Sequence, residues 1–309
     1  MDIIYWIWEN LPFSEFLNPY KRIYWPYLAL CVFYSIVFIL FSKNQQKIQL
    51  RNWVSPSAKV DYSIWLINYF LQVSILPLIF ANALFFSARV YHFLTDVFGY
   101  CNYKIFMSDW GIVWYSITFI VISDFSRFLL HYILHHNRFL SHLHKMHHSA
   151  DVLTPFTLYR SHPLEMILSH IRYLVVYAVV TGIFLYLYND FYEFPKLFGA
   201  SFFIFISNIL GANLRHSNIP IGFGWLERFI ISPKQHQMHH SVDLSLQNSN
   251  LGSFLSVWDI LFSTWKPSKN IGDIKFGIKE QHKQSLWEEL VYPFVCWWQE
   301  RKVITLKEK

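Results

Sequence analysis

Long apolar runs recur along this chain, and they constrain its fold more than any other feature. Residues 24–41 and 64–86 contain no charged side chain, although Pro77 predicts a kink in the second run. A third run covers residues 110–130 and holds one acidic and one basic side chain near its end. Each run comes near the ~20 residues with which an α-helix crosses ~30 Å of hydrocarbon. Membrane-spanning helices are therefore the first expectation.

Two further runs, residues 172–188 and 197–214, are separated by the short link NDFYEFPK and predict a helical hairpin. Trp and Tyr lie at many of the ends, as is typical of residues at a membrane interface. The chain is 54% hydrophobic and only 15% charged, which is more apolar and less charged than a soluble domain. The sequence thus predicts an all-α fold, an integral multi-pass membrane bundle of four or five helices with the hairpin partly immersed.

The formal charge of +6 does not indicate a nucleic-acid partner, because the basic residues flank the apolar runs. The first connecting loop holds four of them: Lys43, Lys47, Arg51 and Lys59. This arrangement follows the positive-inside rule and attraction to anionic headgroups. It predicts that residues 42–63 lie in the cytoplasm, with Lys21 and Arg22 as an exception. Residues 131–165 and 215–309 are expected on the same side.

The amino terminus and the cysteines give two smaller expectations. The opening segment MDIIYWIWENLPF lacks the basic start and the small-residue cleavage site of a signal peptide, so we expect an interfacial helix there. Cys31, Cys101 and Cys296 are far apart and odd in number, and Cys31 lies inside an apolar run. No disulfide framework follows, and the working end of the protein is expected in a reducing compartment.

Three histidine clusters follow the apolar runs and share one spacing, in the segments HYILH, HKMHH and HQMHH. Their members are His131 and His135, then His144, His147 and His148, then His236, His239 and His240. Positions i, i+3 and i+4 of a helix lie on one face, so each cluster is expected to direct its imidazoles to a common point. This geometry favours His135 over its neighbour His136. The last two clusters, about ninety residues apart, are spelled alike, which argues against a solvated histidine tract.

Eight convergent imidazoles predict a site for two metal ions. They exceed the ligands of one tetrahedral zinc and leave an open position on each of two ions, and a pair of irons holds and reduces dioxygen. No HExxH segment is present, which counts against a zinc metalloprotease. A metal-binding membrane transporter and a zinc-dependent lipid hydrolase remain as alternatives. Transport sites usually lie near the bilayer midplane, whereas these clusters follow the apolar runs.

The pattern over roughly residues 123–265 resembles the fatty acid hydroxylase and sterol desaturase superfamily of membrane di-iron enzymes. The resemblance rests on D-x6-H-x3-H beginning at Asp124, on the two H-x2-H-H boxes, and on LGSFLSVWDILFSTW after the third box. The thirteen-residue step between the first two boxes favours this family over the acyl desaturases. Tyr132 stands where the family commonly has Arg, and Phe128 and Leu129 stand where it has Tyr-Trp. These departures concern contacts to the substrate or its headgroup rather than the metal chemistry.

The resemblance implies two further ligands, which complete a set of about ten. His162 in RSHPLE corresponds to the His-Pro element of the family, and His216 in HSNIP corresponds to its late histidine before the third box. His142 lies just before the second box and His170 lies inside the predicted hairpin; both are expected not to be ligands.

Asp124 is the candidate partner of a ligating histidine. It lies seven residues before His131, about two helical turns away on the same face. An ionisable group inside a membrane segment suggests a functional role, and a carboxylate that accepts an imidazole N–H fixes the tautomer of the ligand. Pairing with Arg127 is the alternative. Asp259 in VWDILF is expected either to play the same part or to cap a turn.

The function implied by the resemblance is that of a membrane non-haem di-iron oxygenase. It would use two iron ions, replaceable by zinc in the purified protein, and O2 to hydroxylate or desaturate a C–H bond of a lipid such as a fatty acyl chain or a sterol. No G-x-G-x-x-G or C-x-x-C-H segment is present, so a separate electron donor (a cytochrome, ferredoxin or reductase) is expected at the cytoplasmic face. A pterin-using monooxygenase that cleaves ether lipids remains open.

The resemblance also divides the chain into three regions. Residues 1–109 are expected to hold the interfacial helix and the first membrane helices. Residues 110–268 are expected to form the catalytic domain, and residues 269–309 a cytoplasmic tail.

Overall fold

The computed structural model describes residues 11–41, 50–80, 83–101, 110–188, 196–197, 200–278 and 284–307. Helices dominate these residues, and the strands among them are the two-residue pair β1 (Lys196–Leu197) and β2 (Ala200–Ser201), which is antiparallel. The all-α prediction is confirmed. Several expectations lie wholly or mostly outside the described residues: the interfacial helix expected over residues 1–13, of which 1–10 are not described, Lys43 and Lys47 of the basic loop, and most of the link NDFYEFPK.

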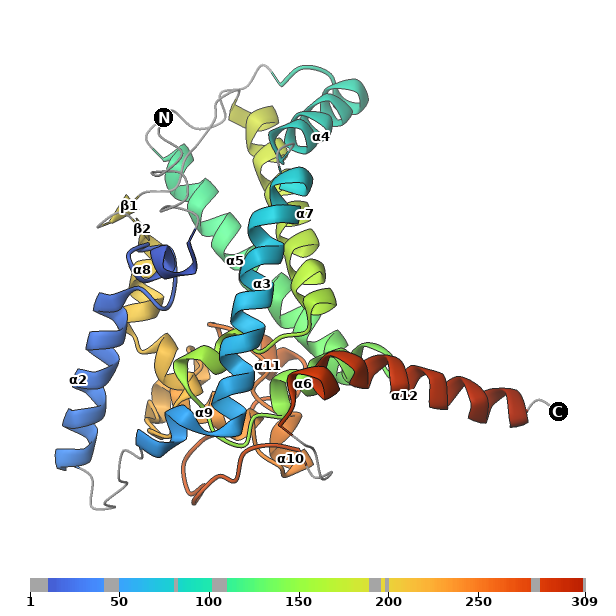
Figure 1. The fold of residues 1–309 in the computed structure, drawn as a ribbon. Helices are drawn as coiled ribbons and strands as arrows, with labels where there is room; N and C mark the ends of the chain where they lie inside the picture. The colour runs from blue at the N-terminus through green and yellow to red at the C-terminus, as the bar shows by residue number, and fades with distance from the viewer. Residues whose placement is uncertain are drawn as a thin grey trace.

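Long helices make up the upper part of the molecule in Figure 1, and α7 (Pro163–Tyr188) is packed against two of them. These are α4 (Ala83–Phe98) at the upper end and α5 (Gly111–His136), which descends beside α7. Two further long helices are α3 (Pro56–Phe80), which also contacts α7, and α2 (Trp25–Phe41), which stands apart at the lower left.

The packing of α7 on its neighbours explains the small and aromatic residues in the sequence. The α5–α7 core consists of Tyr115, Phe119, Val176, Val180 and Phe184. The Tyr115 hydroxyl lies 3.0 Å from Thr181 Oγ1, so the phenol is both packed and hydrogen-bonded. A Cβ at Gly182 would lie 2.5 Å from Val90 Cβ, and α4 therefore approaches α7 closely because this position has no side chain.

Two helices, α5 and α7, are long and apolar enough to cross a membrane; each has 26 residues. Only 28% and 33% of their most apolar windows are buried inside the protein, so both present much apolar surface outward. The shorter α2 is also apolar, and it exposes Phe33, Leu40 and Phe41. The predicted runs 24–41 and 110–130 are helical, and α5 continues to His136. The expected count of four or five crossings is not reached by these two helices among the described residues.

The second arm of the predicted hairpin was wrong in its length. Only α8 (Phe202–Ile209) is α-helical there, and the 3-10 turn η4 (Ala212–His216) follows it. Gly211 ends the helix because it adopts φ +82°, a left-handed conformation that glycine favours. The apolar run therefore turns into the lower part of the protein before it is long enough to span a bilayer.

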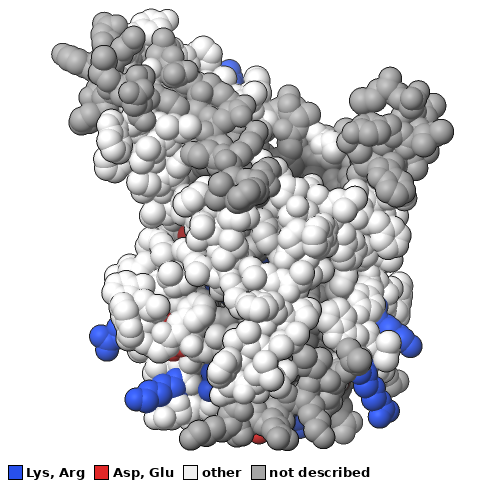
Figure 2. Space-filling view, turned by 90° about the vertical axis from the view of Figure 1, so that its left-hand side faces the viewer, with Lys and Arg blue, Asp and Glu red and all other residues white. Residues whose placement is uncertain are grey.

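Short helices and turns gather below the long helices and form what we call the cap (Figure 1). Its elements are α6 (Leu140–His148), η3 (Pro155–Tyr159), η4, α9 (Pro233–His239), α10 (Leu244–Gln247) and α11 (Val257–Leu261). The last helix, α12 (Leu286–Lys307), contacts α6 and α3 and then extends away from the cap. Figure 2 shows one face of the molecule, on which uncharged atoms cover most of the described surface and Lys and Arg side chains project mainly from the lower part.

One buried arginine connects the cap to α3 and to α12. Arg160 is fully buried, and its guanidinium donates to Asp61 Oδ1 on α3 at 3.0 Å and to Glu289 on α12. Its Nε donates to the carbonyl of Met146 on α6 at 3.0 Å. A buried charge needs this many partners, since an unpaired one would be strongly unfavourable. The segment after residue 268 is thus tied to the cap through Glu289.

Candidate metal centre

The first histidine box lies at the lower end of α5. His131 and His135 are one helical turn apart, with ring centroids separated by 5.0 Å. The neighbouring His136 is exposed and stacks on Tyr132 at 3.9 Å, with its Nδ1 2.8 Å from the Tyr132 carbonyl. His136 is therefore occupied on the outer face of the helix, whereas His135 turns inward.

Local sequence explains why the third box is helical. Ser232 is the N-cap of α9; its Oγ accepts from the backbone N–H of Gln235 at 3.2 Å, and the Gln235 side chain accepts from the Ser232 N–H at 3.0 Å. Pro233 occupies the first helical position, where its missing N–H costs nothing. This reciprocal capping box fixes the start of a seven-residue helix and hence the direction of His236 and His239.

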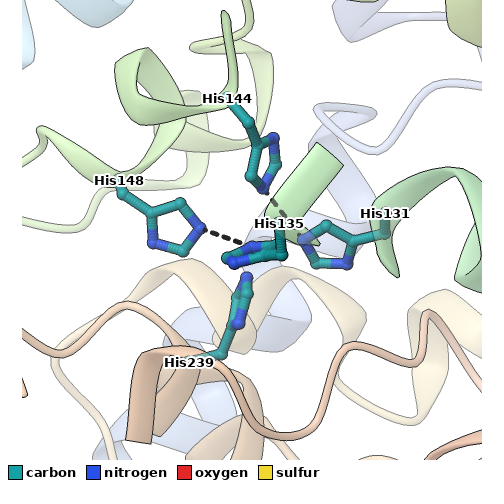
Figure 3. A group of neighbouring side chains, drawn as sticks. All are labelled: His131, His135, His144, His148 and His239. Atoms are coloured by element: carbon teal, nitrogen blue, oxygen red, sulfur yellow. Dashed lines mark hydrogen bonds between the residues drawn. The ribbon is translucent and has the colours of Figure 1, made fainter. Parts of the chain in front are cut away.

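The histidines form two groups, and in each group all the ligand atoms lie within 4.8 Å of one another. The first group contains His131, His135, His144, His148 and His239. The second contains His147, His216, His236 and His240. Figure 3 shows the rings of the first group approaching one centre from different segments. Nine of the ten predicted ligand positions are thus brought together.

The expectation that each box serves one common point was wrong, because the second and third boxes are divided between the groups. His144 and His148 join the first group while His147 joins the second. In the third box the roles are exchanged, since His236 and His240 join the second group and His239 the first. Each triplet gives a pair to one group and a single imidazole to the other.

The helical rotation explains this division. At about 100° per residue, positions i and i+4 differ by about 40° around the axis, whereas i+3 lies about 60° to the other side of i. A triplet spans two directions, so it suits two neighbouring centres better than one. The groups are indeed adjacent: ring centroids of His148 and His240 are 4.9 Å apart, and those of His147 and His148 are 5.7 Å apart.

The hydrogen bonds of the first group determine where the imidazole protons lie. His131 Nδ1 is 2.7 Å from the carbonyl of Leu251, which only accepts, so Nδ1 carries the proton and Nε2 the lone pair. His144 Nδ1 faces Glu165 Oε1 at 2.9 Å, with the same consequence. The two Nε2 atoms nevertheless lie 2.9 Å apart. Two lone pairs at this distance repel each other unless a cation lies between them, so the donor set fits a metal ion.

Other ligating positions are oriented in the same way through Nδ1. His239 Nδ1 is 2.7 Å from the Gln247 carbonyl, and His147 Nδ1 is 3.1 Å from the Arg160 carbonyl. Each contact leaves Nε2 unprotonated, and a ligating imidazole fixed by such an outer acceptor is the usual arrangement in metal sites. His239 Nε2 is buried and has no hydrogen-bond partner among the described residues.

The second group is assembled around His216. This histidine lies outside the three boxes and is predicted as a ligand only by the family resemblance. His216 Nε2 lies 3.2 Å from His236 Nε2 and 3.5 Å from His147 Nε2. His240 Nε2 lies 3.3 Å from His236 Nε2. The left-handed Gly211 directs the chain from α8 into η4, and this turn carries His216 under the cap.

Burial keeps these imidazoles neutral. His239 and His240 are fully buried, and desolvation together with neighbouring imidazoles lowers the pKa of both well below 6.5. The pKa of His147 falls to about 4, mainly through burial. Only neutral imidazole binds a metal, so burial prepares the ligands at neutral pH.

The carboxylate beside the ligands is Glu165, and the expectation for Asp124 was wrong in its partner. Asp124 Oδ2 accepts from the Leu255 N–H at 3.0 Å and from Trp258 Nε1 at 2.9 Å, so it holds the segment after the third box rather than an imidazole. Asp259 similarly accepts from the Leu251 N–H at 2.7 Å. Sequence reasoning assigned no role to Glu165; its only signal was an acidic residue in the first turn of an apolar helix.

The remaining predicted ligand, His162, is not brought to either group. Its Nε2 lies 3.2 Å from the Leu290 carbonyl of α12, and its Nδ1 accepts from the Leu164 N–H at 3.2 Å. Both ring nitrogens therefore serve backbone contacts. His142 and His170 also lie outside the two groups, and the Nδ1 of His170 is 2.8 Å from the Met166 carbonyl.

The five and four imidazoles suit transition metals. Imidazole nitrogen favours iron, zinc, copper and nickel, whereas magnesium and calcium prefer oxygen ligands. The first group adds the negative charge of Glu165 through His144. Each group therefore has enough nitrogen donors to hold one transition metal ion.

Replacing Glu165 with Gln is expected to weaken metal binding at the first group. Gln retains a hydrogen-bond acceptor for His144 Nδ1 but removes the charge that raises the basicity of that ligand. Loss of such an outer partner typically costs ~10- to 100-fold in metal affinity. Competition with a chromophoric chelator measures the change, and Asp273→Asn at an exposed position is the charge-matched control. Unchanged affinity in Glu165→Gln would contradict this role.

Acid is expected to release the metal only below pH 6.5. The pKa of His147 is lower in the folded protein (about 4) than its ordinary 6.5, so the neutral ligating form is favoured and is fully present above 6.5. As the pH falls from 6.5 toward about 4, protons compete with the metal, and both metal retention and folding stability decrease. Metal content after dialysis at graded pH tests this; release already complete above 6.5 would contradict it.

Comparison with known proteins identifies relatives of the histidine-bearing region. Residues 116–264 match the fatty acid hydroxylase family. The Delta(7)-sterol 5(6)-desaturase ERG3B of Gibberella zeae is 28% identical over 151 residues, which cover 48% of this chain and 42% of that protein. The ornithine lipid hydroxylase OlsE of Rhizobium tropici is 23% identical over 192 residues, covering 60% of this chain and 52% of that protein.

A mammalian relative gives a similar match. Lathosterol oxidase of Rattus norvegicus is 25% identical over 179 residues, covering 56% of this chain and 54% of that protein. This chain thus spans about half the length of these relatives. No solved structure matches it significantly.

Proposed function

Since the chain belongs to the fatty acid hydroxylase and sterol desaturase superfamily, we propose that it is a membrane-bound, non-haem di-iron oxygenase that hydroxylates or desaturates a C–H bond of a lipid. The proposed ligands are the nine histidines of the two groups, without His162. The names of the relatives, which include two lipid desaturases or oxidases and a lipid hydroxylase, support an oxidoreductase acting on lipids.

The observation that carries this proposal is the opposition of unprotonated nitrogens in the first group, beside a second group of four converging imidazoles. His131 Nε2 faces His144 Nε2 at 2.9 Å although both rings carry their protons on Nδ1. A proton-sharing histidine network would not place lone pair against lone pair, whereas a cation bound by both nitrogens would stabilise this arrangement. Each group would hold one iron ion, and the adjacent pair would supply the chemistry for a reaction with dioxygen.

The residues around the groups perform the protein's share of the reaction. Bound iron supplies the oxidising chemistry with O2. The carbonyls of Leu251 and Gln247 and the carboxylate of Glu165 hold the imidazoles of the first group in one tautomer and orientation. The complete burial of His239 and His240 shields these two ligands from water.

We propose that α5 and α7 cross the membrane and that the cap lies on the cytoplasmic side. The outward apolar surface of both helices and the Lys and Arg side chains near the cap support this orientation. Residues 110–268 would then form the catalytic domain, which encloses the matched residues 116–264. A lipid dissolved in the bilayer would reach the lower end of α5 directly, and a separate electron-donor protein would approach the cap from the cytoplasm.

Metal analysis and lipid mass spectrometry test the proposal together. The purified protein is expected to hold about two irons per chain, and lipid extracts from cells that express it should contain a product shifted by about +16 or −2 mass units under O2. Zinc replaces iron when zinc is abundant, so expression should be carried out in iron-supplemented, zinc-limited medium. Turnover that persists without O2 would favour a zinc-dependent hydrolase, and metal uptake into vesicles without lipid turnover would favour a transporter.

A further inference from the structure

A cavity of about 290 Å³ lies against both histidine groups. His131 and His144 of the first group line it, as do His147, His216 and His236 of the second. Its size is at the lower end of the range for ligand pockets, ~300–1,000 Å³, so it suits one part of a lipid rather than a whole lipid. Whatever binds in this cavity lies next to both proposed metal ions.

Four arginines line the same cavity, and we call them the arginine cluster: Arg22, Arg127, Arg172 and Arg215. They come from separate parts of the chain, namely the segment before α2, then α5, α7 and η4. Arg127 lies one helical turn before the ligand His131, and Arg215 directly precedes His216. The cluster is therefore built onto the same elements that position the imidazoles.

Two members of the cluster are held by neutral groups only. Arg172 donates to Ser126 Oγ at 2.7 Å and to the Ser123 carbonyl at 3.3 Å, and Arg215 donates to the carbonyls of Ser253 and Ile231. The guanidinium groups of Arg22 and Arg127 make no hydrogen bond or ion pair with any described residue. At least two sets of strong donors are thus available to a ligand.

The two nearby carboxylates, those of Glu165 and Asp124, offset only part of the positive charge of the cluster. Glu165 is engaged by His144, and Asp124 Oδ2 is engaged by Leu255 and Trp258. No ion pair joins either carboxylate to an arginine of the cluster among the described residues. Burial, followed by the charge of Arg127, lowers the pKa of Arg22 to about 10, which still leaves it charged at neutral pH. Four guanidinium groups and one carboxylate, that of Glu165, thus line one cavity, and positive charge predominates there.

We propose that the arginine cluster binds an oxyanion of the lipid substrate, a carboxylate or a phosphate, and so selects acidic lipids over neutral sterols and esters. That the bound lipid is a substrate rests on the proposed function. Binding of an acidic lipid by the arginine cluster does not depend on it. Guanidinium groups pair with carboxylate and phosphate through two parallel N–H donors, and such bonds are strong where water is excluded. An oxyanion offsets the repulsion within the cluster and fixes the lipid beside the histidine groups.

The test measures lipid binding in uncharged detergent, without O2 or reductant, at a pH where carboxylic acids are ionised. The probes are radiolabelled oleate and dioleoyl phosphatidate, each compared with an uncharged counterpart, methyl oleate and dioleoylglycerol. At least one acid is expected to bind about 10- to 100-fold more tightly than its counterpart, as for hydrogen bonds to charged groups. Preference for oleate alone assigns a carboxylate, preference for phosphatidate alone assigns a phosphate, and either supports the proposal.

Arg127→Gln and Arg22→Gln are each expected to reduce that preference by about 10-fold or more, because neither guanidinium group has a hydrogen bond or ion pair with a described residue to lose. Arg127→Lys should retain part of it, and Arg228→Gln, at an exposed position of η5 (Gly224–Arg228), should retain all of it. Equal binding of acids and counterparts, or full preference in both glutamine variants, would overturn the proposal. Selective binding of acidic lipids without any lipid oxidation would contradict only the proposed function. Oxidation of neutral lipids without selective binding of acidic lipids would contradict only this inference.

Discussion

Under the proposed function, His239→Ala is expected to reduce lipid oxidation to background and to weaken iron binding in the first group, where four imidazoles would remain. His239 is fully buried and is the only member of the third box in the first group. Its ring centroid lies 4.5 Å from that of His148 and 4.6 Å from that of His131. Alanine therefore removes one nitrogen from the middle of the donor set and opens a cavity beside the others.

His147→Ala is the mirror experiment, because His147 is the only member of the second box in the second group. Under the proposed function it should likewise weaken iron binding in the second group and abolish turnover, because the proposed reaction uses both ions. The control is His136→Ala, which removes an exposed imidazole from the same stretch of α5. Iron analysis, activity, and helical circular dichroism should be measured on each variant. Turnover retained in both His239→Ala and His147→Ala, with the fold intact, would refute the assignment of the ligands.

The positions of the boxes could be predicted from sequence, but their division could not be predicted from one box at a time. The spacing i, i+3, i+4 was interpreted as one face of a helix, which holds for a single box. The second and third boxes each have three histidines, and each box contributes to both metal centres. It can do so because the i+3 histidine points about 60° away from the first one around the helix axis. The second box gives its middle histidine, His147, to the second group, whereas the third box gives its middle histidine, His239, to the first group. This complementary division becomes evident only when both boxes are placed around the shared centres.

The outer partners of the ligands were the least predictable part of the site. Leu251 and Gln247 contribute backbone carbonyls, and a carbonyl leaves no trace in residue type. Asp124 was a sound candidate by helical phase alone, but its carboxylate is nearer to two N–H donors that arrive more than a hundred residues later in the chain. Glu165 gained its role because α7 starts at Pro163, which directs the first turn of that helix toward His144.

The same reasoning explains why the second arm of the predicted hairpin is short. The run 197–214 is apolar enough on composition, yet Gly211 and the 3-10 turn after it direct Asn213 and His216 into the cap. Asn213 Nδ2 donates to the carbonyl of Arg22, which is a tertiary contact that composition does not record. Apolarity predicts where a segment is stable, but the turn residues and the polar side chains decide where it ends.

Arg160→Met is expected to destabilise the protein by about 3–5 kcal/mol, the usual consequence of removing one partner from a buried ion pair. Arg160, Asp61 and Glu289 are all almost completely buried, so the substitution leaves two carboxylates without their cation. It also removes the donor to the Met146 carbonyl at the end of α6. Thermal unfolding in detergent, followed by circular dichroism, measures the loss.

A second variant separates charge from packing. In the triple variant Arg160→Met, Asp61→Asn, Glu289→Gln the uncompensated charges are gone, so much of the lost stability should return if the carboxylates are its cause. Arg228→Gln at the surface is the control for arginine removal and should change the unfolding temperature little.

The backbone carbonyl of Arg160 also orients His147, so in the Arg160→Met variant iron in the second group should be lost at a lower temperature than in the unaltered protein. If the Arg160→Met variant is as stable as the unaltered protein, α3, α6 and α12 are held together by other contacts.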